Sequence, residues 1–337
     1  MMKTPIIAFS LFGLAACGGS QSSSTATAPT PPAPAPSPAA MQTPAPAETA
    51  KAAEPAKEEK PATPAAPTPA VKYTDGFATP ETVLYDEAGD RYLVSNINGK
   101  PTDADDNGYI SELSPDGKVT KDKFIAGGVN KVKLDGPKGL ALHGGTLYVA
   151  DLQTVREFDA KTGAHKADVH IKGSSFLNGI SVGADGKVYV SDSGLKMGSG
   201  GLEPDGLDAV YVIEKGKVKH IAKGKELGNP NGVLATDKGL WVVTFGSGEL
   251  YRLDDKGKRE DVTKLPDAGL DGVVWAGDQL LISSWKSQSI YKGKANDKFE
   301  AVLTGIKAPA GIGYDSKRHR VLVPRFMDNS VEAYDVK

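Results

Sequence analysis

The chain has 337 residues, of which 39% are hydrophobic, and its 40 basic and 42 acidic side chains leave a net charge of −2. Because charges of both signs are interspersed and form no basic stripe, the composition argues against nucleic acid or an anionic membrane surface as a partner. With a single cysteine, the chain has no intramolecular disulfide.

The first residues have the features of a bacterial export signal. Lys3 supplies a positive charge, and the apolar stretch 6–14 is too short to span a bilayer. The tetrapeptide Leu14-Ala15-Ala16-Cys17 resembles the lipobox of bacterial lipoproteins. That resemblance implies a lipoprotein signal peptide at 1–16, cleavage before Cys17, and acylation of this cysteine. The alternative is an ordinary secretory signal with a cysteine that stands at this place by chance.

The segment after Cys17 is predicted to be a disordered linker. Residues 17–70 are rich in Pro and Ala and offer almost nothing to bury, so they cannot offset the entropy cost of ordering. We therefore expect a protein of the cell envelope, tethered to a membrane by its lipid. Gly18 follows the anchor in place of Asp. By the sorting rule for Gram-negative lipoproteins, this favours the outer membrane, facing the periplasm or the cell surface, if the source is such a bacterium.

The remainder of the chain, 71–337, consists of six similar units spaced by roughly 40 to 57 residues. Each unit contains short β-rich runs bounded by turn residues, without helical periodicity. Six four-stranded units around an axis make an all-β, six-bladed β-propeller. The sixth unit shows only three strands, at 310–314, 321–325 and 330–336. We expect residues 71–73 to supply the N-terminal strand that closes this last blade and removes an exposed edge.

One residue begins the innermost strand of each unit, and in a propeller these residues point into the central channel. We call them the opening residues; in chain order they are Glu81, Lys138, Asn178, Asn231, Asp271 and Ala310. Four carry oxygen donors, and two carboxylates with two amides match a hard divalent cation such as Ca²⁺ or Mg²⁺. No opening residue is His or Cys, which argues against Zn²⁺. Because Asn-Gly and Asp-Gly pairs are common turn formers, a turn is the alternative interpretation.

The segments around four of these residues resemble those of a known family, the senescence marker protein (regucalcin) and gluconolactonase-like propellers. The resemblance covers about 75–337 and is carried by Pro80-Glu81, Leu177-Asn178-Gly179, Pro230-Asn231-Gly232 and Leu270-Asp271-Gly272. It implies that Glu81, Asn178, Asn231 and Asp271 hold a divalent cation, usually Ca²⁺. It also implies a metal-dependent hydrolase of small lactones or esters, in which Asp271 is both a metal ligand and the catalytic general base.

Two positions depart from the sugar-lactonase branch of that family. Phe176 stands where an Arg helps to hold the substrate, and Gly179 stands where Asp is frequent, so sugar specificity does not carry over. No histidine opens an inner strand, unlike in related phosphotriesterase and arylesterase propellers. We expect a monomer that acts on a small lactone or ester. The alternative is a non-catalytic ligand-binding or scaffolding propeller with a structural Ca²⁺ ion.

A second set of oxygen donors lies between the second and third strands of the first unit. Residues 103–110 spell D-x-D-x-N-G-x-I, so Asp103, Asp105 and Asn107 alternate as in the first part of an EF-hand loop. Ser114 occupies the place of the closing Glu. The loop is therefore either an incomplete Ca²⁺ site or an acidic hairpin tip. We expect it, together with a Gly-rich insertion at 194–208, on the face where the inner strands begin, as a lid or rim. The alternative is a passive elongated loop.

Overall fold

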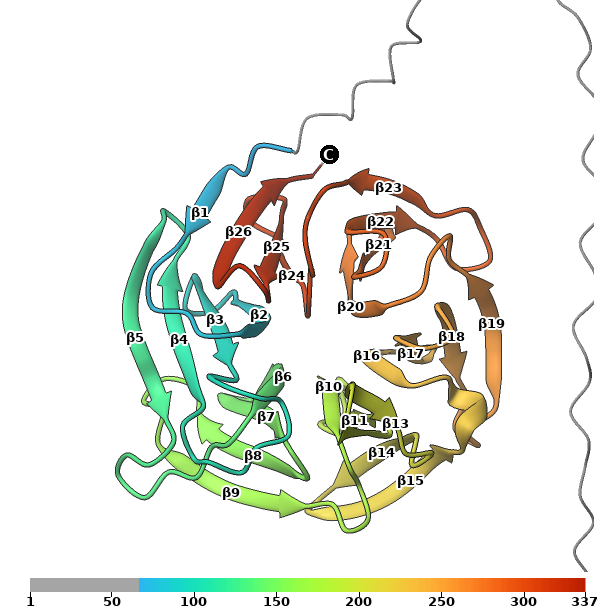
Figure 1. Ribbon diagram of the computed structural model, residues 1–337, viewed down its shortest axis with the longest axis horizontal. Helices are drawn as coiled ribbons and strands as arrows, with labels where there is room; N and C mark the ends of the chain where they lie inside the picture. The colour runs from blue at the N-terminus through green and yellow to red at the C-terminus, as the bar shows by residue number, and fades with distance from the viewer. Residues whose placement is uncertain (1–66, 337) are drawn as a thin grey trace, which may run out of the picture. The chain divides into compact units, whose positions relative to one another are not determined.

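The computed structural model describes residues 67–336, which form six four-stranded antiparallel sheets and one separate two-stranded hairpin. The six sheets stand around a central axis as blades (Figure 1). The prediction of an all-β, six-bladed propeller is confirmed. The expected signal peptide at 1–16, Cys17 and most of the linker expected at 17–70 lie outside the described residues. Between 67 and 336, no helix has the length and apolarity needed to cross a bilayer.

Each blade runs from the channel outward in chain order. Blade 1 consists of β2 (Pro80–Asp86), β3 (Arg91–Asn96), β4 (Tyr109–Ser114) and β5 (Lys118–Ala126). Blade 2 consists of β6 (Pro137–His143), β7 (Thr146–Asp151), β8 (Thr154–Asp159) and β9 (His165–His170). Blade 3 consists of β10 (Leu177–Val182), β11 (Val188–Asp192), β14 (Ala209–Glu214) and β15 (Lys217–Lys223). The separate hairpin, β12 (Leu195–Gly198) with β13 (Gly201–Pro204), is inserted between β11 and β14.

The same order continues in the second half of the ring. A short 3₁₀ helix, η1 (Lys225–Leu227), leads into blade 4, which consists of β16 (Pro230–Thr236), β17 (Gly239–Thr244), β18 (Glu249–Leu253) and β19 (Arg259–Lys264). Blade 5 consists of β20 (Leu270–Ala276), β21 (Gln279–Ser284), β22 (Ser289–Gly293) and β23 (Glu300–Leu303).

Blade 6 joins the two ends of the propeller. It contains β24 (Gly313–Asp315), β25 (Arg320–Arg325) and β26 (Ser330–Asp335), and β1 (Val71–Tyr73) pairs with β26 as the outermost strand. The N-terminal strand therefore closes the last blade, as predicted. The inner strand β24 is shorter than the expected 310–314, because the Gly311 backbone bonds across to blade 1. Its N–H donates to Glu81 O (2.8 Å), and its carbonyl accepts from Val83 N–H (3.0 Å).

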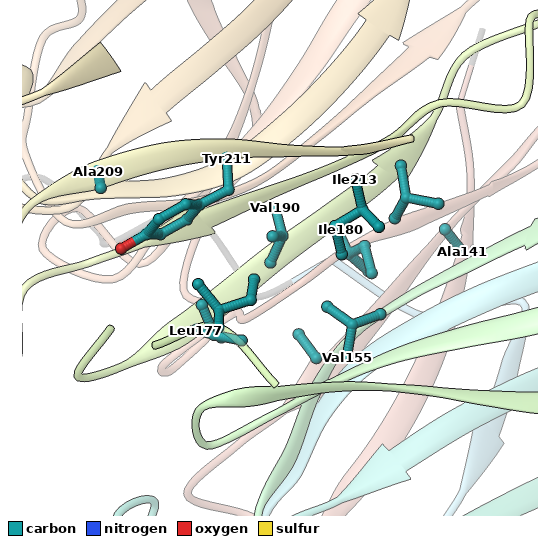
Figure 2. Packing of buried hydrophobic residues seen from close by; sticks show 11 residues of the cluster. Ala141, Val155, Leu177, Ile180, Val190, Ala209, Tyr211 and Ile213 are labelled. Atoms are coloured by element: carbon teal, nitrogen blue, oxygen red, sulfur yellow. The ribbon is translucent and has the colours of Figure 1, made fainter. Parts of the chain in front are cut away.

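The hydrophobic core lies between neighbouring blades. Blades 2 and 3 meet through Val155, Leu177, Ile180 and Val190, whose side chains point toward one another in Figure 2 and are buried. Second strands are apolar on both faces because a blade packs on each side of them; Leu280, Leu281 and Ile282 of β21 are fully buried, for example. Outer strands face solvent, and β5 and β15 each carry three lysines, which discourage pairing with other chains.

The closing strand β1 contributes the buried aromatic ring of Tyr73, which packs edge-on against Tyr92 and donates a hydrogen bond to Ser114 O (2.8 Å). We predict that Tyr73→Ala lowers the free energy of unfolding by about 3–5 kcal/mol, because it removes a large buried ring at the seam between the chain ends. Denaturant unfolding measures the loss. Val302→Ala on the outer strand β23, where the side chain is exposed, is the matched control and should cost under about 0.5 kcal/mol. Equal losses in the two variants would contradict the predicted contribution of Tyr73 to closing the propeller.

Candidate functional site

Each of the first five inner strands carries an irregularity at its opening residue. The regular pairing of β2, β6, β10, β16 and β20 with the second strand breaks between the residue before the opening residue and the second residue after it. Such a bulge re-aims the side chains next to it. The Asn-Gly and Asp-Gly pairs thus lie inside strands, and the alternative interpretation as turns is wrong.

The glycine after the opening residue is required by the neighbouring blade. A Cβ atom on Gly179 would lie 2.3 Å from Asn231 O, and one on Gly232 would lie 2.3 Å from Asp271 O. Gly139 stands in the same relation to Asn178 O, at 2.4 Å. Any larger residue would push the inner strands apart. The glycine therefore serves the packing of the ring, and the preceding residue is left free for chemistry.

Four of the opening residues lie at one end of a single cavity. The cavity is the central channel, with a volume of about 410 Å³, and its lining includes Glu81, Asn178, Asn231 and Asp271. The four side chains are each only 4–5% exposed. The lining continues along the inner strands to Tyr85, Leu142, Leu234, Trp275 and Tyr314 near the opposite end. The structure thus places all four predicted metal ligands, including the predicted base Asp271, in the same channel.

The two carboxylates are in an environment that disfavours their negative charge. Burial raises the pKa of Glu81 to about 7, although a hydrogen bond from Thr82 Oγ1 (2.6 Å) opposes the shift. Burial also raises the pKa of Asp271 well above its ordinary value, and the charge of Glu81 raises it further. Two buried carboxylates that repel each other need a compensating positive charge nearby. A cation bound between them would supply it.

Part of that compensation comes from Lys138, a residue to which the sequence analysis assigned no role. Its side chain is fully buried, and burial lowers the pKa of its ammonium to about 8, against the attraction of Asp151 and Glu81. Nζ donates to Gly136 O (3.1 Å) and lies 4.3 Å from the centre of the Phe176 ring, a cation–π contact. A lysine among the opening residues was the available signal, because lysine is rarely buried without a partner.

The two amides complete the donor set. Asn178 uses its Nδ2 to donate to Ser193 Oγ (3.1 Å), which leaves its Oδ1 available. The Asn231 side chain lowers the pKa of the neighbouring Asp271 carboxyl. Among residues 67–336, no three His, Cys, Asp or Glu side chains gather as a metal site. The residues present fit a hard divalent cation, but only if both amide oxygens join the two carboxylates.

The EF-hand-like loop of blade 1 is occupied by contacts of its own. Asp105 Oδ2 accepts from Asn107 Nδ2 (2.7 Å), and Asp106 Oδ1 accepts from Leu134 N–H (2.9 Å). These bonds fasten the loop to itself and to the segment before blade 2. The backbone N–H of Asp103 donates to Lys100 O (3.2 Å) in a turn. The absence of an acidic metal cluster noted above includes this loop. A second Ca²⁺ at Asp103, Asp105 and Asn107 stays a prediction.

Both insertions lie at the end of the channel where the inner strands begin. Asn96, which precedes the loop, pairs with Pro80 at the start of β2, and Asp192, which precedes the β12–β13 hairpin, pairs with Leu177 at the start of β10. We call this end of the channel the loop end. The hairpin carries a cross-strand pair of exposed apolar side chains, Met197 and Leu202. The placement of the two insertions agrees with the prediction that they form a rim at this end of the channel.

Comparison with known proteins supports the fold. Neither the models of known protein families nor the curated proteins include a match. A gluconolactonase from Xanthomonas campestris superposes with a TM-score of 0.57 at 17% identity, over 77% of this chain and 87% of that one. A putative gluconolactonase gives 0.55 at 17% identity, over 77% and 90%. A catalytically inactive virginiamycin B lyase from Staphylococcus aureus gives 0.53 at 16% identity, over 78% and 97%. The chain therefore shares its propeller fold with gluconolactonase-like proteins and with this lyase.

The raised pKa of Glu81 predicts a pH dependence of stability in the metal-free protein. The folded state holds a proton that the unfolded chain releases above pH 4.5, so this stabilisation is complete below that pH and is lost as the pH rises toward about 7. Relative to Glu81→Gln, chelator-treated wild type should lose about 2–3 kcal/mol of unfolding free energy between pH 5 and pH 7.5. Denaturant unfolding of both proteins tests this.

Two comparisons make that test specific. Saturating Ca²⁺ should reverse the trend, because a bound cation favours ionised carboxylates. The titration of Lys138, with a pKa of about 8, falls mainly above this window. A wild type whose stability relative to Glu81→Gln is constant from pH 5 to 7.5 would show that Glu81 is ionised throughout and would contradict the prediction.

Proposed function

We propose that the protein is a divalent-metal-dependent hydrolase of small lactones or esters. The proposal is carried by one observation: two carboxylates and two amides line the loop end of a channel of about 410 Å³ within a six-bladed propeller. The family resemblance of the same four segments points to the same chemistry. The volume suits a small molecule. The ion expected there is Ca²⁺, given the all-oxygen donor set.

The four site residues have different roles in the proposed reaction. Glu81, Asn178 and Asn231, together with one oxygen of Asp271, would hold the cation, which when bound would polarise the carbonyl of the substrate. Asp271 accepts a proton from the attacking water, and its low-polarity surroundings make the ionised carboxylate a stronger base. The water oxygen forms a bond to the carbonyl carbon, the bond from that carbon to the ring or ester oxygen breaks, and the departing oxygen receives the proton. The products are a hydroxy acid from a lactone, or an acid and an alcohol from an ester.

Asp271→Asn separates these roles. The amide keeps an oxygen for the cation but cannot accept a proton, so turnover should fall on the order of 10² to 10⁴ with only a partial loss of Ca²⁺ binding. A panel of lactones and esters, assayed with Ca²⁺ and with chelator, gives the rates. Asp267→Asn is the control, since this partly exposed carboxylate pairs with Lys286. If Asp271→Asn turns over substrate at the wild-type rate, the proposed base is wrong.

A specific observation also favours a second candidate, a scaffolding or ligand-binding propeller. The four donor side chains are 4–5% exposed, and a structural ion is expected to be enclosed by protein. In that case Ca²⁺ would raise the melting temperature, because it binds only the folded state. The panel distinguishes the two candidates. A wild type that binds Ca²⁺ tightly and hydrolyses nothing on the panel would be assigned to the second.

We also propose that the protein works in the cell envelope, held by a lipid on Cys17. The support is the sequence from Lys3 to Cys17, which resembles a lipoprotein signal. Cys17→Ser should remove the acceptor sulfur, block acylation and release the protein from the membrane fraction. Metabolic labelling with a radioactive fatty acid, followed by fractionation, measures both effects. Incorporation of label into Cys17→Ser, or wild type found only in the soluble fraction, would contradict the anchor.

A further inference from the structure

The residue that follows the second strand of a blade lies beside the opening residue of the same blade. This follows from the antiparallel pairing of the first two strands. The same backbone hydrogen bond accompanies it in several blades. In each case, the N–H of the residue after the second strand donates to the carbonyl two positions before the opening residue. The bonds are Ser193 to Phe176 (3.0 Å), Phe245 to Asn229 (2.9 Å), Trp285 to Gly269 (2.8 Å) and Phe326 to Ala308 (3.2 Å).

Blade 3 shows what such a residue does. Ser193 Oγ accepts from Nδ2 of Asn178, the opening residue of that blade, and itself donates to Pro230 O (2.7 Å). The hydroxyl thereby sets which end of the Asn178 amide is turned away from it. Ser193 acts on the channel through Asn178 and is itself fully buried. The equivalent residue of blade 5 lies beside Asp271, the opening residue of that blade.

That position is occupied by Trp285, and its indole N–H has no formed hydrogen bond. Nε1 is buried without a partner in the region that the structure describes. Leaving a buried donor unpaired costs free energy, so a hydrogen-bond acceptor is expected close to Nε1. The carboxyl of Asp271 is the acceptor at hand, because Leu270, the residue before Asp271, pairs with Ser284, the residue before Trp285. In the present geometry no hydrogen bond joins the two side chains.

The ring of Trp285 is held in place from both sides. Phe245 packs edge-on against it with a centroid distance of 5.7 Å, and Phe326 lies at 5.0 Å. The three aromatic rings come from equivalent positions of blades 4, 5 and 6, directly after β17, β21 and β25. Clamped rings of this kind lose little freedom when the N–H forms a bond. The indole N–H is therefore a hydrogen-bond donor held in a fixed place beside Asp271, the predicted base.

We propose that Trp285 is a positioning residue for Asp271: its indole N–H donates to one carboxylate oxygen and leaves the other oxygen to the cation. The inference rests on the proposed function, in that a cation is what the second oxygen would bind. Partners of this type fix the orientation of metal ligands. The indole is donor-only, so it favours the ionised carboxylate that both metal binding and proton acceptance require.

The first test is Ca²⁺ affinity. Trp285→Phe keeps an aromatic ring between Phe245 and Phe326 but removes the N–H. By calorimetric titration with Ca²⁺, the dissociation constant should rise on the order of 10-fold to 100-fold. Trp241→Phe, the same substitution at a buried core position of β17, is the matched control and should bind Ca²⁺ as wild type does. An unchanged constant in Trp285→Phe would overturn the inference.

The second test observes the N–H directly and does not need the metal. The chain has three tryptophans, so a ¹H–¹⁵N spectrum contains three indole signals, and the one missing from Trp285→Phe is that of Trp285. In metal-free protein, Asp271→Ala should move this signal upfield and speed its exchange with solvent. Ca²⁺ should move it downfield in wild type only. A signal that is the same in wild type and Asp271→Ala would overturn the inference.

The two tests separate this inference from the proposed function. If wild type fails to bind Ca²⁺ but the Trp285 signal responds to Asp271→Ala, the proposed Ca²⁺ site is wrong, and the contact between Trp285 and Asp271 is supported. If Ca²⁺ binds wild type and Trp285→Phe equally, the metal stands and the positioning role falls.

Discussion

The close approach of neighbouring inner strands is the constraint on which the channel depends. Backbone atoms of adjacent blades come so near at the bulges that only glycine fits after most opening residues. Serine side chains strengthen the same contact in alternate blades. Ser95, Ser191 and Ser283 each accept from the N–H after their own opening residue and donate to the carbonyl of the next one. The serine hydroxyls thereby link blades 1 and 2, blades 3 and 4, and blades 5 and 6 through the backbone at the opening residues. The side chains of the opening residues are not needed for these contacts and can differ.

Because the side chains of the opening residues can differ from blade to blade, some of them can carry charge. Glu81 and Asp271 would carry −2 when ionised, and Lys138 returns one positive charge, so the channel is left with about one negative charge before any ion binds. Buried carboxylates without enough compensation take up protons, which is the direction of both pKa shifts. The phenyl ring of Phe176 accepts the Lys138 ammonium on its face. This contact occupies the position at which the resemblance would have placed an arginine, and it gives the channel a different arrangement of positive charge.

Fold and chemistry are decided at different places in this molecule. A gluconolactonase and a virginiamycin B lyase share the fold at 17% and 16% identity, so the fold itself names no reaction. The blades supply rigid strand ends, and the reaction depends on the side chains presented there. The loop end of the channel also carries aromatic side chains. The aromatic rings of Phe245, Trp285 and Phe326 contact one another across three blades, edge-on in the first pair and tilted in the second. Trp285 follows Ser284, which pairs with Leu270 just before Asp271.

The sequence by itself determined the number of blades, the closing strand and the identity of the opening residues. These depend on local patterns, such as turn residues between short apolar runs, that repeat along the chain. It did not reveal that the Asn-Gly and Asp-Gly pairs lie in bulges, because a turn and a bulge use the same residue types. It also missed Lys138 and Trp285. Their importance comes from burial and from neighbours more than one strand away, such as Glu81 for Lys138. Only the tertiary structure decides which buried charges and donors meet, since those distances are set by how the blades close the ring.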